Sequence, residues 1–256
     1  MLLAIDVGNT NIVYGLFDGT KLVHQFRVET SRGRTADEYA VVLHQLLALR
    51  DIPKSAVTQA IVASVVPAVT DPMIGLVRSI FGIEVAVVGP GIKTGMPILI
   101  DNPREVGADR IVNAVAAYER FKTGLIVVDF GTATTFDCVS PRGEYLGGVI
   151  APGINISADA LFTRAARLPR VEIAKPPRTL GKNTVHSMQS GIVYGYVGLV
   201  DGIVDRLLVD LDYEECPVIA TGGLAKLIAP LTRTIRDVDD ELTLVGLRIL
   251  HDRQLV

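Results

Sequence analysis

Hydrophobic residues form two matching patterns, one at the start of the chain and one near its middle. Residues 2–18 and 125–137 each begin with an apolar run that contains one aspartate, Asp6 or Asp129, and continue through a glycine into a second apolar run. When Asp6 is aligned with Asp129, the offset is 129 − 6 = 123 residues and Gly8 coincides with Gly131. Each stretch therefore predicts a strand, a tight turn lined by Asn or Thr, and a second strand.

The remainder of the first half predicts helices alternating with strands. Thr35 to Glu38 fits a capping box at the start of a helix, and Gly82 is suited to end a second helix. The expected strands cover 21–29, 60–66 and 85–88. The expected helices cover 35–50, a stretch that begins near Pro67 or Pro72 and ends at Gly82, and 111–121. The first half therefore reads βββαβαβα.

The second half also places three strands before alternating helices and strands. Its further elements are a strand at 144–150, a turn at 151–157 that feeds a helix to residue 164, an irregular crossing at 169–182, a long helix at 184–208, a strand from 217 that enters a Gly-Gly turn, and a helix at 240–252. The chain is therefore expected to form an α/β fold of two similar lobes, 1–121 and 122–256.

Composition narrows the classes of protein that these halves can form. The 256 residues are 49% hydrophobic, with a mean hydropathy of +0.38, a net charge of −3 and a pI of about 5.8. No Lys/Arg block is present, so we expect no nucleic-acid partner. No apolar run reaches the ~18 residues of a membrane span, and the start of the chain lacks a secretory signal, so we expect a cytoplasmic protein without a membrane partner.

The cysteines and histidines give no sign of a metal centre. Cys138 and Cys216 lie in or next to apolar strands, which predicts buried structural thiols. The four histidines have no spacing typical of a metal cluster. Zinc chemistry is therefore not expected.

The two glycine turns have the composition of a phosphate site. Glycine tolerates positive φ and lets backbone N–H groups point at an anion, and Asn and Thr add neutral donors. An aspartate beside such a turn repels phosphate, so Asp6 and Asp129 are expected to hold a cation or a bound water. One Asp-x-Gly turn also occurs in hairpins for steric reasons alone, but two in register favour a functional explanation.

The long helix expected at 184–208 has glycines spaced by three and four residues along one side. These are Gly191, Gly195, Gly198 and Gly202. Such a side permits close approach by another helix. Tight internal packing and a subunit interface both explain it at this point.

The duplicated pattern resembles the superfamily of acetate and sugar kinases, Hsp70 chaperones and actin, and within it the type III pantothenate kinases. The resemblance lies in six segments: Asp6-Val-Gly-Asn-Thr-Asn11, Asp101-Asn-Pro-Arg-Glu-Val-Gly-Ala-Asp-Arg110, Val128-Asp-Phe-Gly-Thr-Ala-Thr134, Gly147-Gly-Val-Ile-Ala-Pro-Gly153, Gly181-Lys-Asn-Thr184 and Thr221-Gly-Gly-Leu224. It implies an actin-like ATPase fold of two ribonuclease H-like lobes, with a cleft between the lobes in which the two turns grip the ATP phosphates.

The activity that the resemblance implies is transfer of the ATP γ-phosphoryl group to the primary hydroxyl of pantothenate, the first step towards coenzyme A. Asp6 then organises the Mg²⁺ on ATP, and Asp129 helps to bind a monovalent cation, K⁺ or NH₄⁺. The implied ATP-binding residues are Gly8, Asn9, Thr10, Asn11 and Val13 in the first lobe, Gly131 and Thr132 in the second, and Gly222 and Gly223 beside the adenosine.

The implied pantothenate-binding residues are Gly107, Ala108, Asp109, Arg110 and Thr184. Asp109 is the candidate base, because a carboxylate within ~3 Å of the hydroxyl can accept its proton. Asp109 also suits the first turn of a helix, where a negative side chain is favoured by ~0.3–1 kcal/mol, and both roles can hold. Arg110 offers a planar donor fork for the carboxylate or amide oxygens of pantothenate. Thr184 is either a substrate contact or a helix N-cap.

Ile100 departs from the family pattern, in which many relatives carry an aromatic residue. By this resemblance we expect weaker binding of pantothenate and no effect on the phosphate chemistry. Other readings are another small-molecule kinase, a phosphatase acting on polyphosphate, or a regulatory accessory protein of the same family. Retention of Asp6, Asp109 and Asp129 together favours the kinase. The glycine side of the long helix and the resemblance predict a homodimer with the pantothenate pocket near its interface.

Overall fold

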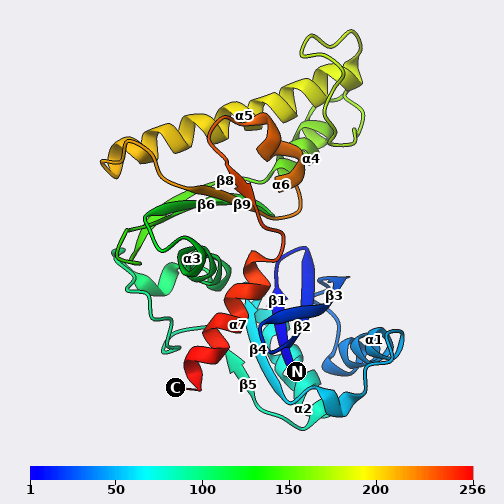
Figure 1. The fold of residues 1–256 in the computed structure, drawn as a ribbon. Helices are drawn as coiled ribbons and strands as arrows, with labels where there is room; N and C mark the ends of the chain where they lie inside the picture. Colours follow the sequence, from blue (N-terminus) through cyan, green and yellow to red (C-terminus); the bar gives the residue numbers. More distant parts are fainter. Residues whose placement is uncertain (256) are drawn as a thin grey trace. The chain divides into compact units, whose positions relative to one another are not determined.

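The computed structural model describes residues 1–255 (Figure 1). The chain forms two compact units. Unit 1 consists of Met1–Ala116 and the C-terminal segment from Glu241, and unit 2 consists of Ala117–Asp240. Within the described residues, no helix has the length and apolar content needed to cross a membrane.

A five-stranded sheet with the order β3-β2-β1-β4-β5 forms the centre of unit 1. β1 is antiparallel to β2 and parallel to β4, so it lies in the middle of a mixed sheet. The strands are β1 (Leu2–Val7), β2 (Asn11–Asp18), β3 (Lys21–Glu29), β4 (Gln59–Ser64) and β5 (Val85–Val87). The helices are α1 (Ala36–Ala48), α2 (Pro67–Phe81), the first part of α3 (Ala108–Phe121) and α7 (Leu242–Gln254).

Both faces of the first sheet are covered, which explains why β1 is apolar almost throughout. Leu3 and Ile5 share a core with Tyr39 and Leu43 of α1. On the other face α7 contacts β1, β2 and β4, and Figure 1 draws it in red beside these blue and cyan strands. Leu244 of α7 packs so closely on β2 that a Cβ added there, at Gly15, would lie 2.9 Å from it.

The sheet of unit 2 repeats this arrangement strand for strand, in the order β8-β7-β6-β9-β10. β6 is antiparallel to β7 and parallel to β9, as β1 is to β2 and β4. Its strands are β6 (Leu125–Phe130), β7 (Ala133–Val139), β8 (Tyr145–Pro152), β9 (Val218–Thr221) and β10 (Asp237–Val238). Its helices are α4 (Ile154–Arg164), α5 (Thr184–Asp210) and α6 (Ala225–Ile228), and α5 packs its apolar residues on β6.

Several expected elements are confirmed together with their physical cause. Thr35 and Glu38 form both hydrogen bonds of the capping box at the start of α1. Gly82 ends α2 in the left-handed conformation, with φ +67°. β3 occupies residues 21–29, and residues 169–182 form no helix or strand.

Other boundaries differ from the expected ones. α3 begins at Ala108 because the carbonyl of Gly107 already accepts hydrogen bonds from the N–H groups of Arg110 and Ile111, three residues before the apolar periodicity becomes clear. α4 likewise begins at Ile154, inside the segment expected to be a turn. β10 has two residues, too few to produce a periodic signal.

The C-terminal helix belongs to the compact unit of the first half, whereas the sequence-based lobes of 1–121 and 122–256 place it with the second. Leu242, Leu244, Leu247 and Leu250 of α7 are buried. A Cβ added at Gly246 would collide with the carbonyl oxygen of Val112 in α3. This packing joins α7 to unit 1, and the other boundary between units falls after Ala116, inside α3.

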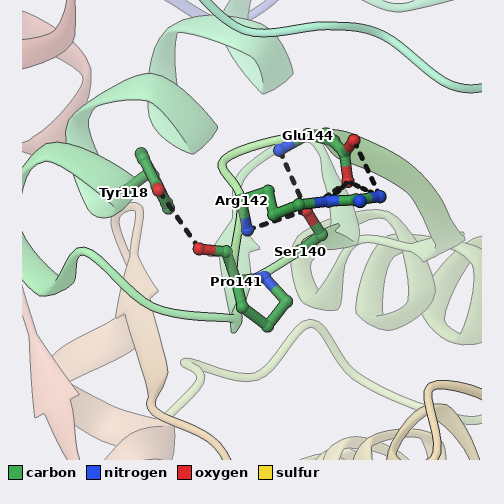
Figure 2. A network of polar contacts seen from close by, with 5 residues as sticks. All are labelled: Tyr118, Ser140, Pro141, Arg142 and Glu144. Carbon is green, nitrogen blue, oxygen red and sulfur yellow. Dashed lines mark hydrogen bonds and ion pairs between the residues drawn. The ribbon is translucent and has the colours of Figure 1, made fainter.

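The turn between β7 and β8 is held by a polar network (Figure 2). The Ser140 hydroxyl donates to Glu144 Oε2 at 2.7 Å and accepts the Arg142 and Glu144 N–H groups at 3.2 and 3.1 Å. Arg142 pairs with Glu144 at 3.1 Å, and the Tyr118 hydroxyl of α3 donates to the Pro141 carbonyl at 3.2 Å. The Ser140 hydrogen bond lowers the pKa of Glu144, so the network favours an ionised carboxylate.

Replacing Gly143 in this turn with alanine should destabilise the protein. Gly143 has φ +78°, and a Cβ there would lie 2.5 Å from the Tyr118 ring. We expect Gly143→Ala to lower the free energy of unfolding by about 2–4 kcal/mol, because a positive φ and a steric overlap both add to the cost. Urea denaturation followed by circular dichroism measures the change.

The matched control is Gly19→Ala in the corresponding turn of unit 1. Gly19 has φ +58°, but a Cβ there meets no described atom within 4 Å. We expect a loss of only about 1 kcal/mol, from the backbone conformation alone. Equal losses for the two variants would contradict the steric role of Tyr118.

Candidate functional site

The glycine turn of unit 1 joins β1 to β2 and is fixed by hydrogen bonds on both sides. The Gly8 N–H donates to the Asn11 carbonyl at 3.0 Å and closes the turn. The Thr30 hydroxyl donates to the Gly8 carbonyl at 2.7 Å, and the Thr30 N–H donates to the Thr10 carbonyl at 3.0 Å. Asn9 and Thr10 are exposed at the tip. The turn therefore presents neutral polar groups to solvent from a rigid backbone.

Three of the expected site residues share one face of this hairpin. Asp6 lies directly opposite Val13 in the register of β1 and β2, so their side chains point to the same face. Asn11, two residues before Val13, also belongs to that face. The structure therefore brings Asp6, Asn11 and Val13 together beside the turn.

The turn of unit 2 is built around Asp129, which occupies the same place in β6 as Asp6 in β1. Asp129 lies between Thr135 of β7 and Thr221 of β9. A Cβ at Gly222, which has φ +91°, would collide with the Asp129 Oδ1 atom, and one at Gly131 would lie 3.6 Å from it. Asp129, Gly131 and Gly222 therefore form one compact group, whereas a Cβ at Gly223 meets no described atom within 4 Å.

Thr132 lies against Gly153, which the sequence did not predict as a site residue. A Cβ at Gly153 would collide with the carbonyl oxygen of Thr132. Gly153 is also the N-cap of α4, so it brings the start of that helix against the turn. Gly153 ends one of the segments that carry the family resemblance, and that was the available signal for its importance.

Asp109 and Arg110 lie in the first turn of α3. A Cβ at Gly107 would lie 2.6 Å from Asp109 Oδ1 and 3.7 Å from Val65, whose N–H donates to the Val7 carbonyl at 3.1 Å. The start of α3 is therefore next to the ends of β1 and β4. Ligands of open α/β sheets bind at this carboxyl edge.

The environment of Asp109 changes its acidity. Burial raises the pKa of this half-buried carboxyl, and the N–H hydrogen bond and charge of Arg110 oppose the rise in part. The Arg110 N–H donates to Asp109 Oδ1 at 2.8 Å. A carboxylate with a raised pKa is a stronger proton acceptor than an ordinary aspartate.

Thr184 is the first residue of α5, and it is not the N-cap. Asn183 fills that position and accepts the N–H of His186 at 2.8 Å. Thr184 lines a groove of about 950 Å³ together with Lys182, Met188, Ile192 and Tyr196 among others. The N-cap explanation of Thr184 is therefore wrong, and its position in a mainly apolar groove is compatible with a ligand contact.

The glycine side of α5 borders the same groove. A Cβ at Gly191, Gly195 or Gly198 would meet no described atom within 4 Å. Gly191 and Gly195 line the groove. Packing against other described residues of the chain therefore does not account for these glycines.

The described residues contain no group of three or more His, Cys, Asp or Glu side chains that could hold a metal ion. Cys138 is buried, as expected, and Cys216 is partly buried. Burial raises the pKa of Cys216 to about 11, so its thiol is protonated at neutral pH and is a poor nucleophile.

The repeated sheets place the chain in the class of actin-like ATPase folds, which includes sugar kinases. A solved structure with this fold is a ROK family glucokinase from Streptomyces griseus in complex with glucose and AMPPNP (TM-score 0.55, 13% identity, covering 97% of this chain and 98% of that one). A Campylobacter jejuni structure described as a Baf family transcriptional activator is also similar (TM-score 0.59, 17% identity, covering 99% and 98%). At these identities the likeness concerns the fold alone.

Sequence comparison assigns the family. Residues 2–206 match the family described as type III pantothenate kinase. A type III pantothenate kinase from Pelobacter propionicus is 61% identical over 254 residues, which cover 99% of both chains. The chain belongs to the type III pantothenate kinase family.

Replacing Gly222 with alanine should disturb the group around Asp129. Gly222 has a positive φ, and a Cβ added there would collide with Asp129 Oδ1 and lie 2.7 Å from the Phe130 backbone, which leaves no space for a methyl group. We expect Gly222→Ala to lower the free energy of unfolding by about 2–4 kcal/mol. Gly223→Ala, one residue away and facing open space, should cost at most about 1 kcal/mol, and a similar loss for both variants in urea denaturation would refute the close contact.

Proposed function

We propose that this protein transfers the γ-phosphoryl group of ATP to the primary hydroxyl of pantothenate and forms 4′-phosphopantothenate, the first step of coenzyme A biosynthesis. The observation that carries the proposal is the 61% identity to the Pelobacter propionicus type III pantothenate kinase over 99% of both chains. We place the activity in the cytoplasm, where reducing conditions suit a chain with two thiols, Cys138 and Cys216.

The two glycine turns bind ATP in this proposal. Gly8, Asn9, Thr10 and Asn11 supply backbone and side-chain donors to the phosphates, and Val13 packs beside them on the face of Asp6. In unit 2, Gly131 and Thr132 take the same role. Gly222 and Gly223 adjoin the adenosine. A Cβ at Gly223 would meet no described atom within 4 Å, so its absence leaves room for a flat ligand to approach the backbone.

The two aspartates of the turns hold cations. Asp6 is the carboxylate for Mg²⁺, and Asp129 is the carboxylate for K⁺ or NH₄⁺, because such hard cations prefer oxygen ligands. One carboxylate per turn suits Mg²⁺, which commonly binds through one or two carboxylates, phosphate oxygens and water. When bound, Mg²⁺ neutralises charge that develops on the transferring phosphoryl group.

Asp109 acts as the base. An aliphatic hydroxyl is a poor nucleophile, and a carboxylate with a raised pKa accepts its proton as the bond to phosphorus forms. Arg110 binds the carboxylate or amide oxygens of pantothenate through its planar fork, and Gly107 and Ala108 let the substrate approach the start of α3. Thr184 contributes a hydroxyl to pantothenate binding from the apolar groove of unit 2.

A homodimer formed through the groove of α5 completes the proposal, with the pantothenate pocket near the interface. The glycine side of α5 faces open space in the described chain. Large apolar side chains are also exposed in unit 2. Ile156, Leu161 and Phe162 lie on α4, and Leu180 lies in the segment before α5. A second copy of α5 would bury this surface, and glycines allow two helices to approach closely.

The function is tested by an ADP-release assay. We expect ADP release with ATP, Mg²⁺ and pantothenate, higher in the presence of K⁺ or NH₄⁺ than without either. A panel of sugars and short acids replaces pantothenate in parallel reactions and should give only background release. Turnover of a sugar in place of pantothenate, or no turnover at all, would refute the proposal.

Asp109→Asn should slow phosphorylation by about 100-fold or more while ATP still binds, because the base is removed and the shape is kept. For the wild-type protein, kcat/KM should decrease as the pH is lowered. This decrease should begin at a higher pH than it would for an ordinary aspartate, since burial raises the pKa of Asp109. Unchanged turnover of the variant would remove Asp109 from the role of base.

The variant should not lose stability. A carboxyl whose pKa is raised by folding costs the folded state free energy as the pH rises from its unfolded pKa to its folded pKa, and the cost is complete above both values. Asp109→Asn should therefore have a thermal unfolding midpoint at pH 7 equal to or above that of the wild type. A lower midpoint would show that loss of activity reflects loss of structure.

Gly195→Glu should break the homodimer. The new carboxylate would stand in the apolar groove, where pairing with a second copy leaves it unsolvated. Light scattering at micromolar concentration should give a dimer for the wild type and a monomer for the variant. Val209→Glu, on the same helix at a side chain that is 79% exposed and outside the groove lining, should stay dimeric; a monomeric wild type would contradict the proposal.

A further inference from the structure

The segment Thr30–Thr35, between β3 and α1, is fastened to the glycine turn of unit 1. The Thr30 hydroxyl and N–H bind the carbonyls of Gly8 and Thr10 at 2.7 and 3.0 Å. Two residues further on, Arg32 Nη2 donates to Asn9 Oδ1 at 3.3 Å. Three hydrogen bonds thus join this segment to three consecutive residues of the turn.

The rest of the segment is held by α1. The buried Tyr39 of α1 accepts the Ser31 N–H at 2.9 Å and donates its hydroxyl to the Ser31 carbonyl at 2.7 Å. Thr35 closes the segment with the capping box of α1. Because both ends are fixed, the position of the Arg32 backbone beside the turn is set by unit 1 itself.

Arg32 brings a positive charge to a turn that has none. Residues 6–13 include no lysine or arginine, and their one charged residue is Asp6. A guanidinium carries five N–H donors in a planar fork, so a bond to Asn9 leaves donors for a second acceptor. Arginine forks match phosphate oxygens, and such charge-assisted hydrogen bonds are about twice as strong as neutral ones.

The neighbouring arginine has a different task. The Arg34 guanidinium lies over the Tyr39 ring, 5.8 Å from its centroid, on the side of α1. Arg32 is exposed, and its bond to Asn9 places it at the turn tip, where Asn9 and Thr10 also reach solvent. Of the two arginines, Arg32 is therefore the one available to an anion at the turn.

We propose that Arg32 binds the phosphates of the nucleoside triphosphate, as the cation of the phosphate site in unit 1. This inference rests on the proposed function of the turn in ATP binding. It adds a residue outside the repeated Asp-x-Gly stretch, and the Thr30 hydrogen bonds are what bring it there.

Calorimetric titration with a non-hydrolysable ATP analogue and Mg²⁺, without pantothenate, tests the proposal. We expect Arg32→Ala to weaken binding of the triphosphate by roughly 10- to 100-fold and binding of adenosine by less than about twofold. Arg32→Lys should recover part of the loss, because it restores charge without the fork. Arg50→Ala removes the same charge beyond the opposite end of α1, roughly 20 Å away, and should change neither affinity.

A double-variant cycle separates direct binding from an effect through Asn9. If Arg32 contacts phosphate, Arg32→Ala should still cost about tenfold or more in an Asn9→Ala background. No further loss in that background, equal weakening of adenosine and triphosphate, or unchanged affinity of Arg32→Ala would each overturn the proposal. Thermal unfolding checks that the exposed position leaves the fold intact.

The outcome is independent of the acceptor substrate. Titration measures the nucleotide alone, whereas the ADP-release assay of the wild type tests pantothenate phosphorylation. Wild-type turnover together with unchanged binding by Arg32→Ala would remove Arg32 and leave the proposed function in place. Tight triphosphate binding that depends on Arg32, without turnover of pantothenate, would support the role of Arg32 and refute pantothenate phosphorylation.

Discussion

The central strand of each sheet carries one carboxylate near its end, and the backbone around it leaves little room for any residue but glycine. In unit 2 a methyl group at Gly222 would collide with the carboxylate of Asp129. In unit 1 a Cβ at Gly8 would lie 3.1 Å from the carbonyl oxygen of Asn11. In unit 1 the turn after β1 is therefore tight, which keeps its N–H groups and short polar side chains near the carboxylate, and in unit 2 the backbone after β9 packs directly against the carboxylate. The remaining elements of each unit hold this arrangement in place.

The last helix of the chain gives an example of that support. Gly246 lets α7 lie against the Val112 carbonyl of α3, and the Thr243 hydroxyl donates to Asn113 Oδ1 at 2.7 Å. Asp109 is on the first turn of the same α3, one helical turn before Val112. A segment more than 130 residues away along the chain thus orients the helix that carries the candidate base. Substitutions in α7 can therefore change the position of Asp109 without touching it.

The sequence predicts those features whose cause is local. The capping box of Thr35 and Glu38, the end of α2 at Gly82 and the repeat of β1 in β6 all depend on residues within a few positions of one another. The sequence did not predict features that depend on contacts between residues far apart along the chain. Examples are the hydrogen bond from Thr30 to Gly8 and the packing of α7 on unit 1. At the start of α5 the sequence offered a helix cap as one explanation of Thr184. The N-cap is Asn183 instead, because its side chain accepts the N–H of His186. The family resemblance supplied residue roles that no local pattern could give, and the structure adds the contacts around them.

Electrostatics explains why the turns cannot bind a triphosphate by themselves. Each turn offers neutral donors beside a carboxylate, and a phosphate group placed there meets an anion of its own sign. In the proposed site a cation must therefore accompany the phosphates at each turn, and an oxygen-bound metal ion is one way to supply it. In unit 1 a second way is present in the chain itself, because the Thr30 hydroxyl and the Tyr39 clamp bring the guanidinium of Arg32 to Asn9. The short segment between β3 and α1, which packs back on the turn, thus adds a positive charge that offsets part of the repulsion between Asp6 and an anion.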